Sequence, residues 1–404
     1  MSFLEKLLAD VNVELMPVAE IGELVRGNGL PKTDFTESGV PAIHYGQIYT
    51  HYGLSTVETK SFVSVETAIK LKKVDTGDVV VTNTSENLED VGKALVYLGK
   101  QQAVTGGHAT IFKPKPHILG KYFAYYTQTD EFAQQKRKFA KGTKVIDVSA
   151  TDLAKIKIPI PCPENPEKSL KIQSEIVHIL DKFSAVTAEL TAELTAELSM
   201  RKKQYNYYRD QLFSFEEGTV GWKPLGELAE NLDSKRKPIT SGLRDAGDIP
   251  YYGASGIVDY VKNYIFDGDF LLVSEDGANL LARNTPIAFS ISGKTWVNNH
   301  AHVLKFDTYA ERKYVEYYLN SIDLTPYISG AAQPKLNKKN LENISIPNPS
   351  IDEKVRIVSI LDKFDALTSS ITEGLPREIE LRQQQYEYYR DLLFSFPKSE
   401  TVVV

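Results

Sequence analysis

Residues 176–215 read IVHILDKFSAVTAELTAELTAELSMRKKQYNYYRDQLFSF, and residues 357–396 read IVSILDKFDALTSSITEGLPREIELRQQQYEYYRDLLFSF. The two stretches align without a gap, and 23 of their 40 positions are identical. A repeat of this length and identity reflects a duplication, and it has to be recognised before any shorter motif is interpreted. The chain therefore contains the same long element twice.

The repeated element has the pattern of a long amphipathic helix, because its apolar and aromatic side chains recur mostly at steps of three and four residues. In the first copy they are Ile172, Ile176, Ile179, Phe183, Val186, Leu190, Leu194, Leu198, Tyr205, Tyr208 and Leu212. Three TAEL tetrads at 187–198 step by four throughout, which is a stutter in the heptad pattern. Forty residues of helix span about 60 Å. We expect the second copy to cover this apolar stripe in an antiparallel coiled coil.

The second copy contains two helix-breaking residues, Gly374 and Pro376, in the stretch TEGLPREIE. A proline inside a helix costs about 3 kcal/mol or more. In the first turn of a helix its missing N–H costs nothing. The sequence therefore predicts that the second helix stops near Glu373 and restarts with Pro376 in its first turn.

The segments outside the helices are duplicated more loosely and read as short strands and helices. The matching pairs are TGDVVV (76–81) with DGDFLL (267–272), GHATIFK (107–113) with NHAHVLK (299–305), YFAYY (122–126) with YVEYY (314–318), LAKIKIPIP (153–161) with LENISIPNP (341–349), and PVAE (17–20) with PLGE (224–227). We predict a mixed α/β fold with two pseudo-symmetric globules separated by two long helices. The expected boundaries are 1–161 for the first globule, 162–217 for the central helix, 218–349 for the second globule, 350–397 for the distal helix and 398–404 for a tail.

Composition narrows the class of protein. The 404 residues are 42% hydrophobic and 25% charged, which is ordinary for a globular protein. The single cysteine, Cys162, excludes an intramolecular disulfide and a cysteine-based zinc site. We find neither a signal peptide nor an apolar run long enough to span a membrane, so we expect a soluble, cytoplasmic protein. The net charge of −6 argues mildly against a free-standing nucleic-acid binder.

The motifs of the common nucleotide-dependent enzymes are not found in the sequence. SGKT at 292–295 has Ala288 where a phosphate-binding loop needs its first glycine. No Asn-Pro-Pro-Tyr motif of adenine methylation appears, and no glycine-rich loop suits S-adenosylmethionine. His300 and His302 can chelate a metal from one strand face, but no third ligand is evident and we favour a structural role.

A cluster of carboxylates invites a nuclease interpretation. Asp269, Glu275 and Asp276 lie within eight residues of one another in the sequence of the second globule. The lysine spacing of a known nuclease core is missing beside them. We therefore favour solvated turn carboxylates over a nuclease site.

Polar loops in both globules supply the side chains that read base edges and bind phosphates. Comparable loops at matching positions strengthen this interpretation, although each loop alone is equally well an ordinary polar loop. The candidate DNA-binding residues are Tyr45, Gln47, Thr84, Asn87, His108, Lys136, Arg137, Lys141, Lys144, Lys235, Arg236, Lys237, Tyr252, Asn279, Arg283, Asn298, Asn299, His300, Gln333 and Lys335.

The chain resembles the specificity subunit (HsdS) of type I restriction-modification systems, and particularly the class known as type IC. The resemblance rests on the TAEL tetrads followed by MRKKQYNYYRDQLFSF, on IPIPCPENPEKSLKIQSEIVHILDKF before them, and on the distal ITEGLPREIELRQQQYEYYRDLLFSFPK. It covers nearly the whole chain. The recognition domains vary within this family, so the DNA target itself cannot be transferred.

The resemblance implies a DNA-binding subunit without catalytic residues or a cofactor of its own. Each globule reads one half of a split, asymmetric double-stranded DNA target, and the helices dock two modification subunits that methylate adenine with S-adenosylmethionine. Two restriction subunits join them, and ATP and Mg are expected on these partner subunits.

The aromatic segments QYNYYRD and QYEYYRD are candidates for docking, because aromatic side chains and arginine are typical interface anchors. The candidate partner-binding residues are Tyr207, Arg209, Tyr388 and Arg390. Tyr205, Tyr208, Tyr386 and Tyr389 lie on the apolar stripe, where packing inside the coiled coil is an equal alternative.

Two other functions remain open at this point. One is a nuclease or methyltransferase with an unrecognised motif, which the activity of the purified chain would reveal. The other is a coiled-coil adaptor that binds only proteins, which the absence of sequence-specific DNA binding in the assembled complex would favour.

Overall fold

The computed structural model describes residues 8, 11–330, 333–370 and 372–396. The expected tail at 398–404 lies outside these residues. The chain divides into two compact units, Met1–Ala192 with Glu380–Val404, and Glu193–Ile379. Each unit combines one globule with parts of both repeated helical segments. Within the described ranges, no helix combines the length and the apolar character needed to cross a membrane.

The first globule contains two five-stranded sheets and two short strand pairs. The first sheet has the order β2 (Gly22–Arg26), β12 (Ala109–Pro114), β8 (Val79–Thr82), β10 (Ala94–Tyr97) and β5 (Ser55–Thr56). The second has the order β3 (Phe35–Thr36), β6 (Ser61–Val63), β4 (Val40–Ile43), β11 (Ala103–Thr105) and β7 (Lys72–Val74). The short pairs are β1 (Val13–Pro17) with β14 (Lys157–Pro161) and β13 (Ile146–Asp147) with β9 (Thr84–Ser85). The helices are α2 (Val18–Ile21), α3 (Tyr45–Thr50), α4 (Val65–Lys70), α5 (Gly120–Tyr126), α6 (Asp130–Phe139) and α7 (Ala150–Leu153).

The second globule has two four-stranded sheets and one short strand pair. The first sheet has the order β16 (Glu230–Asn231), β23 (Ala301–Lys305), β20 (Phe270–Ser274) and β21 (Ala288–Ile291). The second has the order β18 (Gly256–Val261), β17 (Ala246–Gly253), β22 (Lys294–Val297) and β19 (Phe266–Asp267). The pair is β15 (Gly221–Pro224) with β24 (Ser345–Asn348). The helices are α9 (Leu225–Leu228), α10 (Asn279–Ala282), α11 (Tyr309–Ser321) and α12 (Lys338–Glu342), with short 3-10 turns such as η2 (Asp233–Lys235).

The central strands explain why their sequences are apolar without alternation. In β8, Val79 and Val81 belong to one buried cluster and Val80 to another. In β20, Leu271 and Leu272 likewise face two different clusters. Successive side chains of a strand point to opposite faces, so a strand covered on both faces needs apolar residues at every position.

The expected pseudo-symmetry is confirmed where the matching segments form strands, although the sheets of the first globule have one more strand each. β12 pairs with β8 so that Ala109 lies opposite Thr82, and β23 pairs with β20 so that Ala301 lies opposite Ser274. The pairs β1–β14 and β15–β24 are both antiparallel. The loosely matching segments of the two globules therefore form matching elements.

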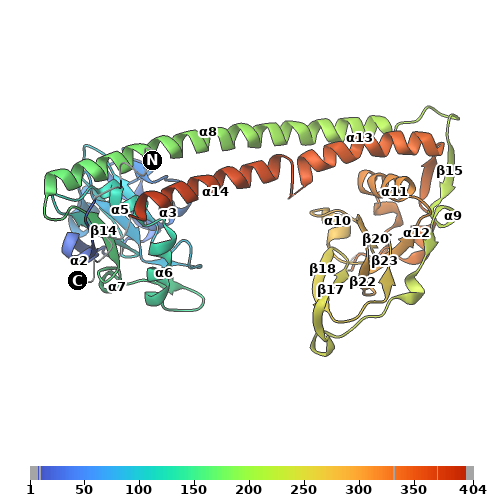
Figure 1. The fold of residues 1–404 in the computed structure, drawn as a ribbon, viewed down its shortest axis with the longest axis horizontal. Coiled ribbons are helices and arrows are strands. Elements are labelled where there is room, and N and C mark those ends of the chain that lie inside the picture. The colour runs from blue at the N-terminus through green and yellow to red at the C-terminus, as the bar shows by residue number, and fades with distance from the viewer. Residues whose placement is uncertain (1–7, 9–10, 331–332, 371, 397–404) are drawn as a thin grey trace, which may run out of the picture. The chain divides into compact units, whose positions relative to one another are not determined.

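The repeated segments form the predicted helices. α8 (Pro166–Leu212) is one unbroken helix of 47 residues (Figure 1). The second copy is divided into α13 (Ile351–Ser369) and α14 (Leu375–Phe394). The first of these helices ends four residues earlier than we predicted, and Pro376 lies in the first turn of α14 as expected. Gly374 has a φ of +86°. A side chain at this glycine would collide with backbone oxygens at the end of α13, so the break needs a glycine here.

The helices pair antiparallel inside each unit. In the first unit, Ser184 of α8 donates a hydrogen bond of 3.0 Å to the Tyr386 hydroxyl of α14. In the second unit, the rings of Tyr205 and Tyr208 of α8 lie against Phe364 of α13. The predicted apolar stripe is covered at most positions. Val186 and Tyr208 are 62% and 47% exposed, so the predicted burial is wrong at these two residues.

Each globule is attached to the helices through the same contacts. The Tyr125 hydroxyl donates to Asp181 of α8 at 2.8 Å, and at the matching positions Tyr317 donates to Asp362 of α13 at 2.6 Å. The ends of the helices insert an aromatic ring in the same way. Phe394 packs against Tyr122 and Tyr126, and Phe213 packs against Tyr314 and Tyr318.

The core of the first unit is shared between distant parts of the chain. Leu393, Phe394 and Phe396 belong to the same buried cluster as the strand residues Val79 and Phe112. The aromatic residues of α5 and the start of α8 complete this cluster. The core of the first globule is thus closed by residues from the end of the distal helix.

Candidate nucleic-acid interface

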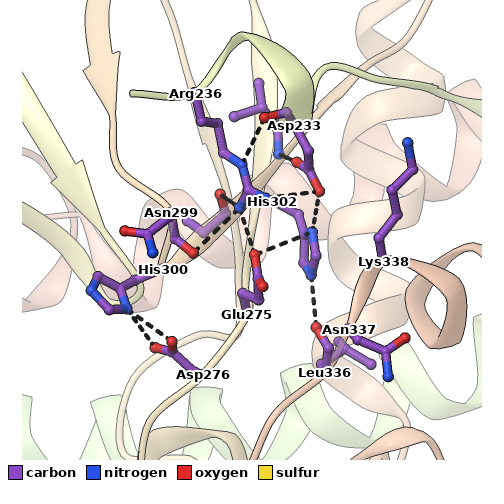
Figure 2. A network of polar contacts seen from close by, with 12 residues as sticks. Asp233, Arg236, Glu275, Asp276, Asn299, His300, His302, Leu336, Asn337 and Lys338 are labelled. Carbon is purple, nitrogen blue, oxygen red and sulfur yellow. Dashed lines mark hydrogen bonds and ion pairs between the residues drawn. The ribbon is translucent and has the colours of Figure 1, made fainter. Parts of the chain in front are cut away.

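Three polar segments of the second globule meet where β20 ends. The Glu275 amide donates to the His300 carbonyl at 2.9 Å, and the Leu336 amide donates to the Glu275 carbonyl at 2.8 Å. The loop before β23 and the segment 333–337 therefore flank the end of β20 (Figure 2). The 3-10 turn η2 adds Asp233 from a fourth direction.

His302 lies at the centre of this arrangement and is fully buried. Its Nδ1 atom lies 2.5 Å from the Asp233 carboxylate, and its Nε2 atom lies 2.7 Å from the Leu336 carbonyl oxygen. Burial opposes ionisation of Asp233, but the His302 ring, the Val303 amide and Arg236 outweigh it and lower the pKa of the carboxyl. Asp233 is therefore a carboxylate at neutral pH.

Glu275 is the second acid of the network. Arg236 donates to it at 2.6 Å, and the Lys335 ammonium lies 3.0 Å away. Burial raises the pKa of this carboxyl, but the hydrogen bonds from Arg236 and Lys335 outweigh the burial, and the net pKa is lowered. Arg236 also donates to the Ala301 carbonyl at 2.8 Å and lies 3.3 Å from Asp233. The network thus contains paired charges rather than isolated ones.

His300 and His302, which we considered above as a chelating pair, do not face each other. His300 is exposed and its Nδ1 atom contacts Asp276 at 2.8 Å instead of turning toward His302 (Figure 2). Asp233, Glu275 and His302 do place ligand-type atoms within 4.8 Å of one another. Arg236 and Lys335 occupy the same carboxylates, so the arrangement is better described as an ion-pair network. Nor do the three carboxylates of the nuclease interpretation gather there, because Asp269 pairs elsewhere, with Arg312.

The first globule repeats this arrangement with neutral groups. We call the arrangement the frame: the residue after a central strand is hydrogen-bonded on one side to the loop before a second strand and on the other side to a later segment of the chain. The Asn83 amide donates to the His108 carbonyl at 2.8 Å, and the Val148 amide donates to the Asn83 carbonyl at 2.9 Å. The Asn83 side chain donates to the Val148 carbonyl at 2.8 Å and accepts from Thr110 at 3.0 Å. Asn83 and Thr110 thus stand where the second globule has Glu275 and His302.

Comparison with known proteins now identifies the chain. The family model described as "Type I restriction modification DNA specificity domain" matches twice, at residues 10–200 and 219–381. The chain belongs to this family of type I DNA specificity proteins. It is accordingly a DNA-recognition subunit and not a catalytic one.

Similar proteins extend the match over the full length of this specificity subunit. The Type I restriction enzyme EcoR124I/EcoR124II specificity subunit of Escherichia coli is 38% identical, with 100% of this chain and 99% of the relative covered. The EcoprrI specificity subunit of E. coli is 36% identical, with 92% of each covered. A chain in a solved structure of the type I R-M system has the same fold, with a TM-score of 0.62, 14% identity and coverage of 95% and 97%. The HsdS subunit of Thermoanaerobacter tengcongensis has a TM-score of 0.50 at 16% identity, with coverage of 95% and 96%.

In the first specificity domain, several predicted residues gather around the repeated frame. The Tyr45 ring lies 4.8 Å from the exposed His108 ring, and Thr84 contacts His108 at 3.1 Å. Gln47 lies on α3 and donates to Ser61. The exposed residues Asn87, Arg137, Lys141 and Lys144 lie further along, and Asn87 and Lys141 pair with Asp90 and Asp152.

Lys136 is wrongly placed in the predicted interface. Only 6% of this residue is exposed, and its ammonium donates to the carbonyls of Glu89 and Val91. Burial lowers the pKa of Lys136 to about 8. The side chain therefore fixes the 88–93 loop from inside and is not available to DNA.

In the second specificity domain, Lys235, Lys237, Asn299 and Gln333 are exposed and Tyr252 is half-buried. Three other candidates must be corrected because their side chains hold the fold. Asn298 is 6% exposed and accepts from the His300 amide, Arg283 donates to the Ile322 carbonyl beyond α11, and Asn279 bonds with the Thr285 backbone. Arg236 belongs to the buried network, while Lys335 is exposed at its edge.

The partner-binding candidates separate cleanly by exposure. Tyr207 and Tyr388 are 62% and 63% exposed, as their positions off the apolar stripe predict. Arg209 pairs with its neighbour Asp210. Arg390 is only 7% exposed and pairs with Asp391, so it is a poor docking residue and this prediction is corrected.

Sequence reasoning missed Asn83, Thr110 and Asp233 as parts of the frame. The match of GHATIFK with NHAHVLK already aligns Thr110 with His302, so the equivalence of these two positions could be predicted from the repeat. Asp233 had no such signal, because it reaches His302 across 69 residues of chain.

Proposed function

We propose that the two specificity domains of this chain each read one half of a split, asymmetric DNA target, and that α8, α13 and α14 separate the domains and dock two modification subunits. The single observation that carries this is the repeated frame. Both domains hold the same three segments together, yet they present different polar groups on them. Two domains with the same backbone arrangement but different polar side chains suit the recognition of two different half-sites.

We further propose that S-adenosylmethionine, ATP and Mg act on partner subunits and that this chain holds no cofactor. The similar proteins are named as specificity subunits of type I restriction enzymes. As the family resemblance implies, we propose that two modification and two restriction subunits complete a cytoplasmic complex. Assignment to the type IC class stays a prediction from the TAEL motif.

The test is to co-express the chain with a matching modification subunit and to map methylated adenines on plasmid DNA. We expect methylation at one bipartite sequence with a fixed spacer. The purified chain alone, given S-adenosylmethionine and the same DNA, should transfer no methyl groups. Methyl transfer by the chain alone, or methylation without a bipartite consensus, would contradict the proposal.

A double substitution tests the docking surface. Replacing Tyr207 and Tyr388 with alanine is expected to weaken binding of the modification subunit by roughly tenfold or more, because a truncated aromatic anchor costs about 2 kcal/mol. Both rings are exposed, so the melting temperature should stay close to that of the unchanged chain. The affinity is measured by titrating labelled modification subunit.

The matched control is Tyr260→Ala, which removes an aromatic ring that is 52% exposed on β18 of the second domain. This variant should bind the modification subunit normally. Unchanged affinity of the double variant would remove these two rings from the docking surface.

A further inference from the structure

The buried ring of His302 joins two segments that approach it from opposite sides. One ring nitrogen faces the Asp233 carboxylate of η2, and the other faces the Leu336 carbonyl of the segment 333–337. A carbonyl oxygen only accepts, so Nε2 carries a proton. The ring therefore ties the 3-10 turn η2 to the segment 333–337.

Charged groups surround the ring. Asp233 is in direct contact, and a Glu275 oxygen lies 3.8 Å from Nδ1. Arg236 and Lys335 bind these carboxylates from their other sides. The two carboxylates and the cationic groups of Arg236 and Lys335 thus form one compact network around the ring.

The first domain makes the corresponding tie without any charge. There, the Asn83 side chain donates to the Val148 carbonyl, and Thr110 only supports Asn83. In the second domain, the matching carbonyl of Leu336 receives its hydrogen bond from His302 instead. The side chain that donates to this carbonyl therefore comes from the end of β8 in the first domain and from β23 in the second.

The segment that His302 holds is the one that carries exposed candidate DNA contacts. The Lys335 and Ser329 backbones exchange hydrogen bonds of 2.8 Å, and the Leu336 amide is fixed on Glu275. Gln333 and Lys335 project from this segment and are exposed. A donor to the Leu336 carbonyl therefore controls where these two side chains stand.

We propose that His302 is a positioning residue for DNA reading by the second specificity domain, and that it acts through the hydrogen bond from Nε2 to the Leu336 carbonyl. The inference rests on the proposed function, because it assumes that this domain reads one half-site. It adds a specificity-determining role for a buried residue that touches no DNA.

Two isosteric substitutions separate the two bonds of the ring. His302→Gln keeps a donor at the position of Nε2 and loses the contact with Asp233, which retains Arg236 and the Val303 amide. His302→Asn keeps a donor toward Asp233 and leaves the Leu336 carbonyl without its side-chain partner. Thr110→Val is the matched control, because it alters the same position in the first domain.

The experiment uses the full chain with modification subunits and two DNA probes, each changed by one base pair in one half-site of the mapped target. We expect His302→Asn to lose roughly tenfold in discrimination against the probe altered in the second half-site. The reason is that the buried Leu336 carbonyl would lack a hydrogen-bond donor, and the free-energy cost of one such group corresponds to a factor of about this size. Discrimination at the first half-site should stay unchanged. His302→Gln should retain most of the discrimination at both half-sites, and Thr110→Val should not change the second.

Hydrogen exchange of the Leu336 amide in the free chain gives a readout that does not depend on DNA. Exchange should accelerate in His302→Asn and stay slow in His302→Gln. Equal loss of discrimination in both variants, or equal loss at both half-sites, would overturn the positioning role. If the unchanged complex methylates without any bipartite consensus, the proposed function itself fails. Hydrogen exchange of the Leu336 amide then still tests whether His302 holds the segment 333–337.

Discussion

Deleting Thr191–Leu194 is expected to yield a complex that methylates the same two half-sites one base pair closer together, with methylation of the original target lost. One tetrad contributes four residues, or about 6 Å of helix, and turns the chain by a net angle of about 40°. One base pair of B-DNA advances about 3.4 Å and turns about 34–36°. The rotation per tetrad nearly matches the rotation per base pair. A specificity domain that faces the wrong groove cannot contact its bases, so we expect the rotation, rather than the translation, to determine the spacer length.

The structure supports the use of tetrads as units of length. α8 continues without a break through all three tetrads, and Leu190, Leu194 and Leu198 are half-buried alike. The distal copy has no tetrads to lose, and the break between α13 and α14 is where we expect the difference in length to be absorbed.

Mapping methylated adenines measures the spacer directly. Glu193→Ala is the control, because it changes a tetrad without changing its length and should leave the spacer as it was. A deletion variant that remains active on the original spacer would show that the tetrads do not measure it.

Exchanging residues 218–348 for the equivalent segment of a relative is expected to replace one half of the target completely and leave the other half unchanged. The ends of this segment lie side by side, because Gly221 pairs with Asn348 in β15–β24. A segment that enters and leaves at one place can be replaced without redirecting the helices. The donor needs tyrosines matching Tyr314 and Tyr317, which contact Phe213 and Asp362 of the retained helices.

The reciprocal exchange is the control for this prediction. Val13 pairs with Pro161 in β1–β14, so residues 13–161 can be exchanged by the same logic. That variant should change the other half-site only. If either exchange altered both half-sites, the two domains would not read independently.

The parts of the fold that follow local periodicity could be predicted from the sequence. The heptad spacing located α8, and the duplicated segments located β8, β12 and α5 together with their counterparts. The break at Gly374 was predicted from backbone chemistry alone. The position where α13 ends was wrong by four residues, because a helix end also depends on the contacts that cap it.

The interface was harder to predict because burial is decided by tertiary packing. Lys136 sits in a basic run that reads as a solvated face, yet the 88–93 loop folds over it. Asn298 and Arg283 have the chemistry of base readers but satisfy nearby backbone groups instead. The network around His302 combines residues from four separate segments, and no local sequence pattern predicts that these segments come into contact.

The shared core of the first unit has a consequence for biosynthesis. Leu393, Phe394 and Phe396 close the cluster that contains strand residues near position 80. A ribosome releases those strands more than 300 residues before these closing side chains. The N-terminal domain emerges first but completes its interior last, so it must wait with apolar surface uncovered while the rest of the chain is made. Sequence-distant contacts of this kind slow folding and expose the nascent chain to aggregation.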